Sequence, residues 1–141
     1  AMSLINLLQK ENKLIAANNI TKLAIKRDPY NSQLKHEYAL NLYNQGAYKL
    51  SLVESQEAYR LVNDFLLNEA LLLKTQFKLN SDSKSLKNLS KLNEKIKSHI
   101  KTISAYRNKD GSFKSKVLKR KFTSMSTLQK DLQQFIDTND I

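Results

Sequence analysis

Side chains able to carry out chemistry are few in this 141-residue chain and lie far apart in the sequence. His36 and His99 are the only histidines, and they do not form the pair four residues apart that places two metal ligands on one helix face. There is no Cys, and carboxylates are mostly isolated, so thiolate, Cys-metal and paired-carboxylate chemistry lack their residues. Gly46 and Gly111 are the only glycines, so no phosphate-binding glycine loop is present. We therefore expect no enzymatic activity, no metal and no cofactor.

Positive charge is the second chemical feature, and it is concentrated in one segment. The chain has a net charge of +11, and residues 74–121 contain 15 Lys or Arg but only three acidic residues. A dense basic patch binds nucleic acid or another polyanion without sequence specificity. A solvated helix face explains the same residues and is favoured, because no groove-reading or stacking motif accompanies them. The candidate polyanion contacts are Lys114, Lys116, Lys119, Arg120 and Lys121.

The elements that must position these residues are predicted to be helices. Only two Gly and one Pro are present, so a protein of many strands would lack its turns. The length suits a single all-α domain. No apolar run approaches the roughly 18 residues that a membrane span requires. We expect a soluble, cytoplasmic protein with no transmembrane segment.

A repeat with a spacing of 34 residues organises the first half of the chain. Small residues recur where two helices would cross, and apolar residues recur on the helix before them. In the second copy Gly46 is suited to end a helix in the left-handed conformation, and Tyr48 begins the return helix. The shift aligns Ala17, Thr21, Ala24 and Pro29 with Ser51, Ser55, Ala58 and Asn63, and Leu4, Ile5 and Leu8 with Tyr38, Ala39 and Leu42.

This pattern resembles the tetratricopeptide repeat, whose period is about 34 residues. The resemblance covers residues 2–80 as about two and a half antiparallel helical hairpins, with a third first-helix at residues 65–79. It implies a concave groove for a peptide or partner helix, and hence an adaptor or chaperone-like protein. Groove-facing positions carried over from the family are Asn6, Gln9, Lys10, Gln33, His36, Leu40, Tyr43, Asn44, Lys74, Phe77 and Lys78.

Residues 81–141 are predicted to form a basic helical extension packed on the same domain. Apolar residues between Lys84 and Arg107 follow three- and four-residue spacings, which indicates a long helix that caps the repeat stack. Residues 108–111 read as a turn, and a last helix is expected at about 124–138. Three interpretations of function remain, namely a protein or peptide partner in the groove, a polyanion on the basic half, and self-association through an uncapped repeat edge.

Overall fold

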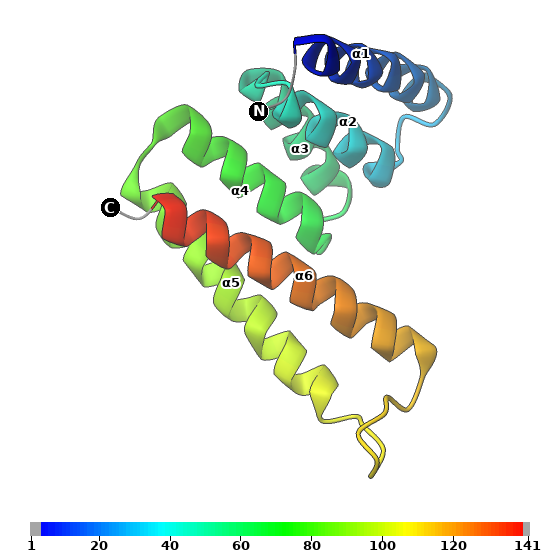
Figure 1. Cartoon of the computed structure of the whole chain (residues 1–141), viewed down its shortest axis with the longest axis vertical. Helices are drawn as coiled ribbons and strands as arrows, with labels where there is room; N and C mark the ends of the chain where they lie inside the picture. The colour runs from blue at the N-terminus through cyan, green and yellow to red at the C-terminus, as the bar shows by residue number, and fades with distance from the viewer. Residues whose placement is uncertain (1–3, 140–141) are drawn as a thin grey trace. The chain divides into compact units, whose positions relative to one another are not determined.

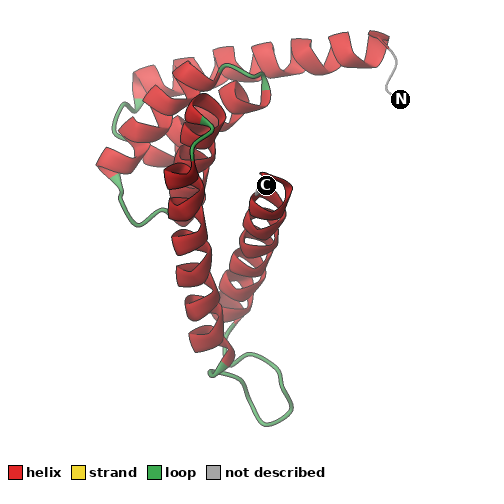
Figure 2. Cartoon of the chain, turned by 90° about the vertical axis from the view of Figure 1, so that its left-hand side faces the viewer, coloured by secondary structure: helices red, strands yellow, loops and turns green. Residues whose placement is uncertain are grey.

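The computed structural model describes the backbone of residues 4–139 and the side chains of residues 13–139. The described chain is helical throughout and has no strand beyond an isolated bridge between Arg107 and Phe113, so the all-α prediction is confirmed. Short loops join the helices, and the longest of them connects α5 to α6 (Figure 2). The helices are α1 (Leu4–Arg27), α2 (Ser32–Asn44), α3 (Tyr48–Leu61), α4 (Leu66–Asn80), α5 (Ser83–Ser104) and α6 (Lys116–Asn139).

The chain divides into two compact units at Ser81 and Asp82. Unit 1 holds α1 to α4 and unit 2 holds α5 and α6. Ser81 ends α4 in the left-handed region with a φ of 51°, and its N–H donates to the carbonyl of Phe77 at 2.7 Å. The Asp82 carboxylate then accepts from Ser85 N at 2.9 Å and begins α5. The capping role predicted for α5 against the repeats stays a prediction.

In unit 1 the helices pack in chain order, α1 on α2, α2 on α3 and α3 on α4, as Figure 1 shows. α2 and α3 form the hairpin predicted from the clearer repeat copy. Ser51, Ser55 and Ala58 of α3 have no exposed surface, and the Ser51 hydroxyl donates to the carbonyl of Ala39 in α2 at 2.7 Å. Small side chains therefore let the two backbones approach, as their spacing predicted.

The turn between α2 and α3 depends on Gly46, whose φ is +82°. The Gly46 N–H donates to Tyr43 O at 3.0 Å and the Ala47 N–H to Leu42 O at 2.9 Å. These two bonds form the Schellman arrangement, which satisfies carbonyls that the helix end leaves free. The predicted left-handed conformation of Gly46 is confirmed.

The earlier repeat copy is not a hairpin, which corrects the prediction. Residues Leu4–Arg27 form one continuous helix where two helices and a turn were expected. The residue 34 positions before Gly46 is Asn12, and no Gly or Pro lies between Leu4 and Arg27. Nothing in that stretch lowers the cost of a left-handed turn, so the helix continues until Asp28 and Pro29.

Unit 2 is an antiparallel pair of long helices, α5 and α6 (Figure 1). The predicted turn at residues 108–111 is confirmed, since Gly111 N donates to Asn108 O at 3.0 Å and Gly111 has a φ of +88°. A single final helix begins at Lys116, earlier than expected, because the Ser115 hydroxyl accepts from Leu118 N at 3.1 Å and caps it. The apolar core of unit 2 consists of Leu89, Leu92, Ile96, Ile103, Met125, Leu128, Leu132 and Ile136.

Candidate interaction surfaces

A buried polar network joins α2, α3 and α4 beside the exposed residues of the predicted groove face of α2. His36 Nδ1 lies 3.1 Å from Asn68 Oδ1, and Asn68 Nδ2 donates to the carbonyl of Ser55 at 2.9 Å. Because the Asn68 amide nitrogen is the donor to Ser55, its oxygen is the acceptor, and His36 must carry its proton on Nδ1. The His36 ring also contacts Phe65, with 4.9 Å between ring centroids. One chain of contacts thus fixes α2 against its two neighbours.

His36 was predicted as a groove or surface residue, and this prediction is wrong. Only 7% of the residue is exposed, and burial lowers the pKa of the imidazole below its ordinary value, although Asn68 and Glu37 oppose that shift. His36 lies on the side of α2 that faces α4, next to the exposed residues Gln33 and Leu40. Its role is structural, since it holds α2 in place. His99 is exposed, as expected.

The remaining groove residues of α2 form an exposed line beside this network. Gln33, Leu40 and Asn44 are exposed and recur at intervals of seven and four residues, which puts them on one side of the helix. Glu37 lies on the same line. Tyr43 borders it half-buried, and its ring meets Tyr48 edge-on with 5.3 Å between centroids. Burial first, and Tyr48 second, raise the pKa of Tyr43 to about 12, so its hydroxyl stays protonated.

The other predicted groove residues belong to α1 and α4. On α4, Lys74 and Phe77 are partly buried and Lys78 is exposed, and all three make interactions within the protein. α4 contacts α2 directly, so the two helices do lie together as the groove prediction requires. Asn6, Gln9 and Lys10 lie outside the residues whose side chains the structure describes.

The five basic residues of the alternative site cluster around the start of α6. Lys114, Lys116, Lys119, Arg120 and Lys121 are all exposed, and none of them pairs with a carboxylate among the described side chains. A pocket of about 400 Å³ lies beside them. Its lining consists of Gly111, Ser112, Phe113, Ser115, Lys116 and Lys119.

An aromatic and cationic cluster that the sequence did not reveal lies next to this pocket. The Phe113 and Phe122 rings are 4.9 Å apart, and the Arg107 guanidinium lies 4.5 Å and 5.0 Å from their centroids. Both rings are partly buried and lie against the Arg107 guanidinium, so this cluster is not an open stacking platform, and both interpretations of the basic surface stay predictions. The interleaving of Phe113 and Phe122 with lysines was visible in the sequence, but their pairing across the turn into α6 was not.

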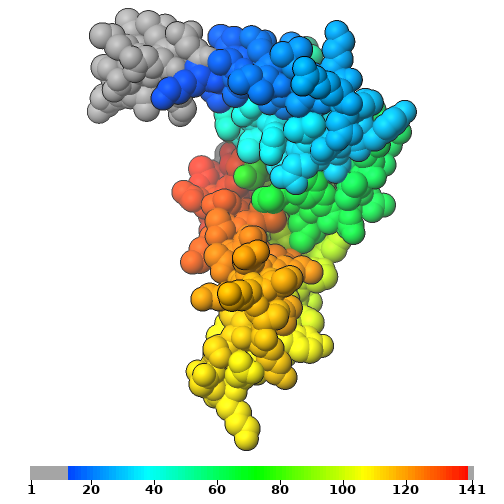
Figure 3. Space-filling view, turned by 90° about the vertical axis from the view of Figure 1, so that its right-hand side faces the viewer, coloured from blue at the N-terminus to red at the C-terminus, as the bar shows by residue number. Residues whose placement is uncertain are grey.

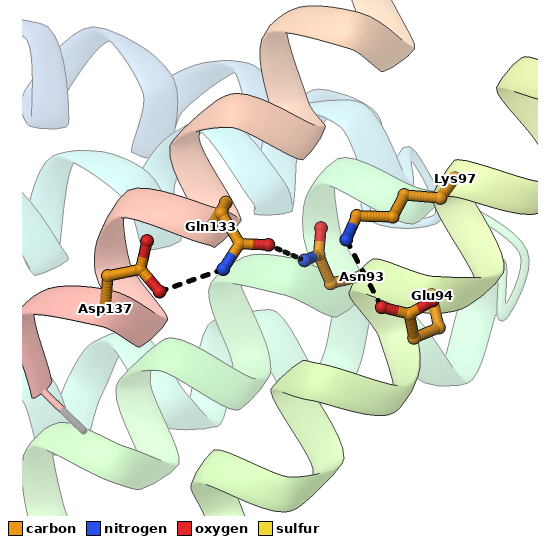
Figure 4. Close-up of polar contacts among 5 residues, drawn as sticks. All are labelled: Asn93, Glu94, Lys97, Gln133 and Asp137. Carbon is orange, nitrogen blue, oxygen red and sulfur yellow. Dashed lines mark hydrogen bonds and ion pairs between the residues drawn. The ribbon is translucent and has the colours of Figure 1, made fainter.

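The middle of unit 2 is fixed by polar side chains between its helices (Figure 4). Asn93 of α5 donates to Gln133 Oε1 at 2.9 Å, and Gln133 Nε2 donates to Asp137 at 2.9 Å along α6. Lys97 pairs with Glu94 at 3.3 Å on the solvent side of α5. Few charged side chains of unit 2 take part in these contacts, so most of its basic side chains remain exposed to solvent.

The described residues contain neither a metal centre nor a membrane span. No three His, Asp or Glu side chains gather in the described part of the chain in a way that could hold a metal ion. None of the helices in residues 4–139 combines the length and apolar character needed to cross a membrane.

Comparison of the chain with family models, curated protein sequences and solved structures finds no match. The tetratricopeptide resemblance is therefore an interpretation of the residue pattern, and the function must be argued from the surfaces themselves.

Proposed function

We propose that the chain is a protein-binding scaffold in which the exposed line of α2 receives a peptide segment of a partner. The observation that carries this proposal is the combination of an open amide-rich line with a buried polar network beside it. Gln33 and Asn44 offer amide groups that can both donate to and accept from an extended backbone. Leu40, which is 39% exposed, supplies an apolar contact between them.

Rigidity of this face favours binding. The link from His36 to Asn68 and on to the Ser55 carbonyl fixes α2 before a partner arrives. A preformed surface loses less conformational freedom on binding, so more of the contact energy appears as affinity. Tyr43, whose hydroxyl is a neutral donor, stands at the end of the line where an aromatic anchor can be covered.

The test is a titration of a captured partner against variants at physiological salt. Tyr43→Ala combined with Phe77→Ala is expected to weaken binding by about 2 kcal/mol per lost anchor. Leu40→Ala should weaken it as well, whereas Val53→Ala on the exposed outer side of α3 is the matched control and should have no effect. Tyr43→Phe separates the hydroxyl from the ring. Circular dichroism of each variant checks that the helices remain intact.

Polyanion binding by unit 2 is the second candidate, and the cluster around Arg107 and the start of α6 favours it. Replacement of Lys119, Arg120 and Lys121 by Gln should leave protein binding on α2 within about 1 kcal/mol, because exposed charges contribute little once screened. The same variant should lose binding to a single-stranded oligonucleotide, and that binding should fall steeply with salt. If the triple variant loses the protein partner and the aromatic variant retains it, the α2 proposal is wrong.

A further inference from the structure

α1 exposes large aliphatic side chains on the side that faces away from α2. Ile20 and Leu23 are 69% and 62% exposed. The opposite side of the same helix makes the contacts within unit 1, since Asn18 is buried and donates to Gln45 at 2.9 Å. The side chains of residues 13–27 lie along the rim of unit 1 in the space-filling view (Figure 3, blue). α1 therefore has apolar residues on a surface that its own unit does not cover.

The exposed residues follow the spacing of a helix-packing stripe. Ala16, Ile20 and Leu23 recur at intervals of four and three residues, so they project from one line along α1. When two helices pack, such a ridge of side chains on one helix fits into a groove on the other. The natural occupant of the stripe is another helix with an apolar face.

The charged residues beside this stripe indicate what kind of helix can bind to it. Among the described side chains, the same spacing reaches Lys13 before Ala16 and Arg27 after Leu23, and both are exposed. No Asp or Glu occurs between these two residues. At a rise of about 1.5 Å per residue, the two end charges stand about 21 Å apart along the helix. Within residues 13–27 the aliphatic side chains of the stripe are thus flanked by a positive charge on either side.

We propose that the outer face of α1 binds an amphipathic helix of another protein, whose apolar stripe is bordered at both ends by acidic residues. A second copy of α1 fits less well, because an antiparallel copy would bring Lys13 against Arg27 and oppose like charges. A lipid surface also fits less well, because the stripe within residues 13–27 offers only Ile20 and Leu23 as large apolar side chains, and membrane binding scales with the apolar area buried. This surface is separate from the α2 line, so either proposal can fail alone.

The experiment uses two synthetic peptides that are capped at both termini and differ only in their end charges. Both carry leucines at three- and four-residue spacing, with a pair of Glu 14 residues apart in the first peptide and a pair of Lys there in the second, matching the separation of Lys13 and Arg27. Binding to the full chain is measured by fluorescence anisotropy. The Glu peptide is expected to bind about tenfold or more tightly than the Lys peptide, because like charges oppose the Lys peptide.

Four variants locate the binding. Ile20→Gln with Leu23→Gln should weaken the Glu peptide about tenfold or more, since these two side chains are the proposed anchors. Val117→Gln on α6 is the matched control, because Val117 is 71% exposed and should not matter. Lys13→Glu with Arg27→Glu should reverse the preference between the peptides. Tyr43→Ala should leave both affinities unchanged, which separates this surface from the α2 proposal.

Each contrary result overturns the inference. Equal affinity for both peptides would show that the contact does not depend on charge. Loss of binding in the Val117 variant would show that the peptide binds at another surface. Light scattering at two concentrations that reveals a dimer, abolished by the Ile20 and Leu23 substitutions, would assign the face to a second copy. Co-sedimentation with vesicles of phosphatidylcholine and phosphatidylserine, abolished by the same substitutions, would assign it to a lipid surface. The Gln substitutions keep a good helix former at exposed positions, so the fold should persist and circular dichroism will verify it.

Discussion

Units 1 and 2 are both helical, yet their interiors are built on different interactions. The crossing helices of unit 1 enclose small and polar residues, and His36, Ser51 and Asn68 are buried there with hydrogen-bond partners. The two helices of unit 2 enclose a row of Leu, Ile and Met, with Leu89 and Leu132 fully covered. Unit 1 therefore combines apolar burial with matched polar geometry, and unit 2 depends mainly on apolar area removed from water.

The difference has a consequence for function. Directional contacts fix helix positions closely, which suits a surface that must present particular side chains to a partner. An aliphatic pair of helices tolerates almost any outer surface, so unit 2 can carry its dense lysines without cost to its core. The two units thus divide the candidate roles between a shaped surface and a charged one.

The strongest test of this contrast is Leu132→Ala in unit 2. The residue is fully buried, so the substitution removes apolar contacts and leaves a cavity. We expect a loss of about 3 kcal/mol in the free energy of unfolding, measured by urea denaturation. Val117→Ala, at a site that is 71% exposed, should change it by less than about 0.5 kcal/mol. Equal effects at both sites would show that the α5–α6 core is misplaced.

Asn68→Leu tests the polar interior of unit 1. The substitution keeps the volume but leaves the His36 Nδ1–H without its acceptor, so we expect a loss of about 2 kcal/mol in unfolding free energy. Adding His36→Leu to Asn68→Leu should recover part of that loss, because both partners are then apolar. Asn93→Leu in unit 2 should cost less, since its partner Gln133 is only partly buried and can turn to water. A larger loss for Asn93→Leu would contradict the comparison.

Gly46→Val probes the turn of the α2–α3 hairpin. A β-carbon at Gly46 would meet no atom within 4 Å, so the cost comes from the φ of +82° alone. A β-branched residue in that region should lower stability by about 1 kcal/mol or more. Gly46→Asn should lower it less, because Asn tolerates the left-handed region. An unchanged thermal midpoint in Gly46→Val would contradict the placement of the turn.

The smallest expected effect is a dependence of stability on pH that belongs to His36. Burial lowers its pKa in the folded state below the unfolded value of 6.5. The folded chain then binds fewer protons than the unfolded chain, so stability is complete above pH 6.5 and declines as the pH falls through the folded pKa. Thermal midpoints measured between pH 7.5 and 5 should show this decline in the native chain and in His99→Gln. His36→Gln should flatten it, and a persistent slope there would assign the effect to other groups.

Local patterns predicted most of the individual elements. Asp28 and Pro29 end α1, Gly46 turns α2 into α3, and residues 108–111 turn α5 toward α6, because each acts on the backbone of its own neighbours. The start of α6 was predicted too late. The cap at Ser115 is one weak local bond, and the cluster of cations after it does not resemble a usual first helical turn.

The sequence by itself determined that the chain is helical, where α2 and α3 reverse, and which faces of α5 and α6 are apolar, since composition and spacing act locally. Only the tertiary structure decided that His36 is buried against Asn68 and that Arg107 covers Phe113 and Phe122. Helical periodicity shows which face of a helix a residue occupies. It does not show which neighbour covers that face, because that depends on how separate helices pack in space.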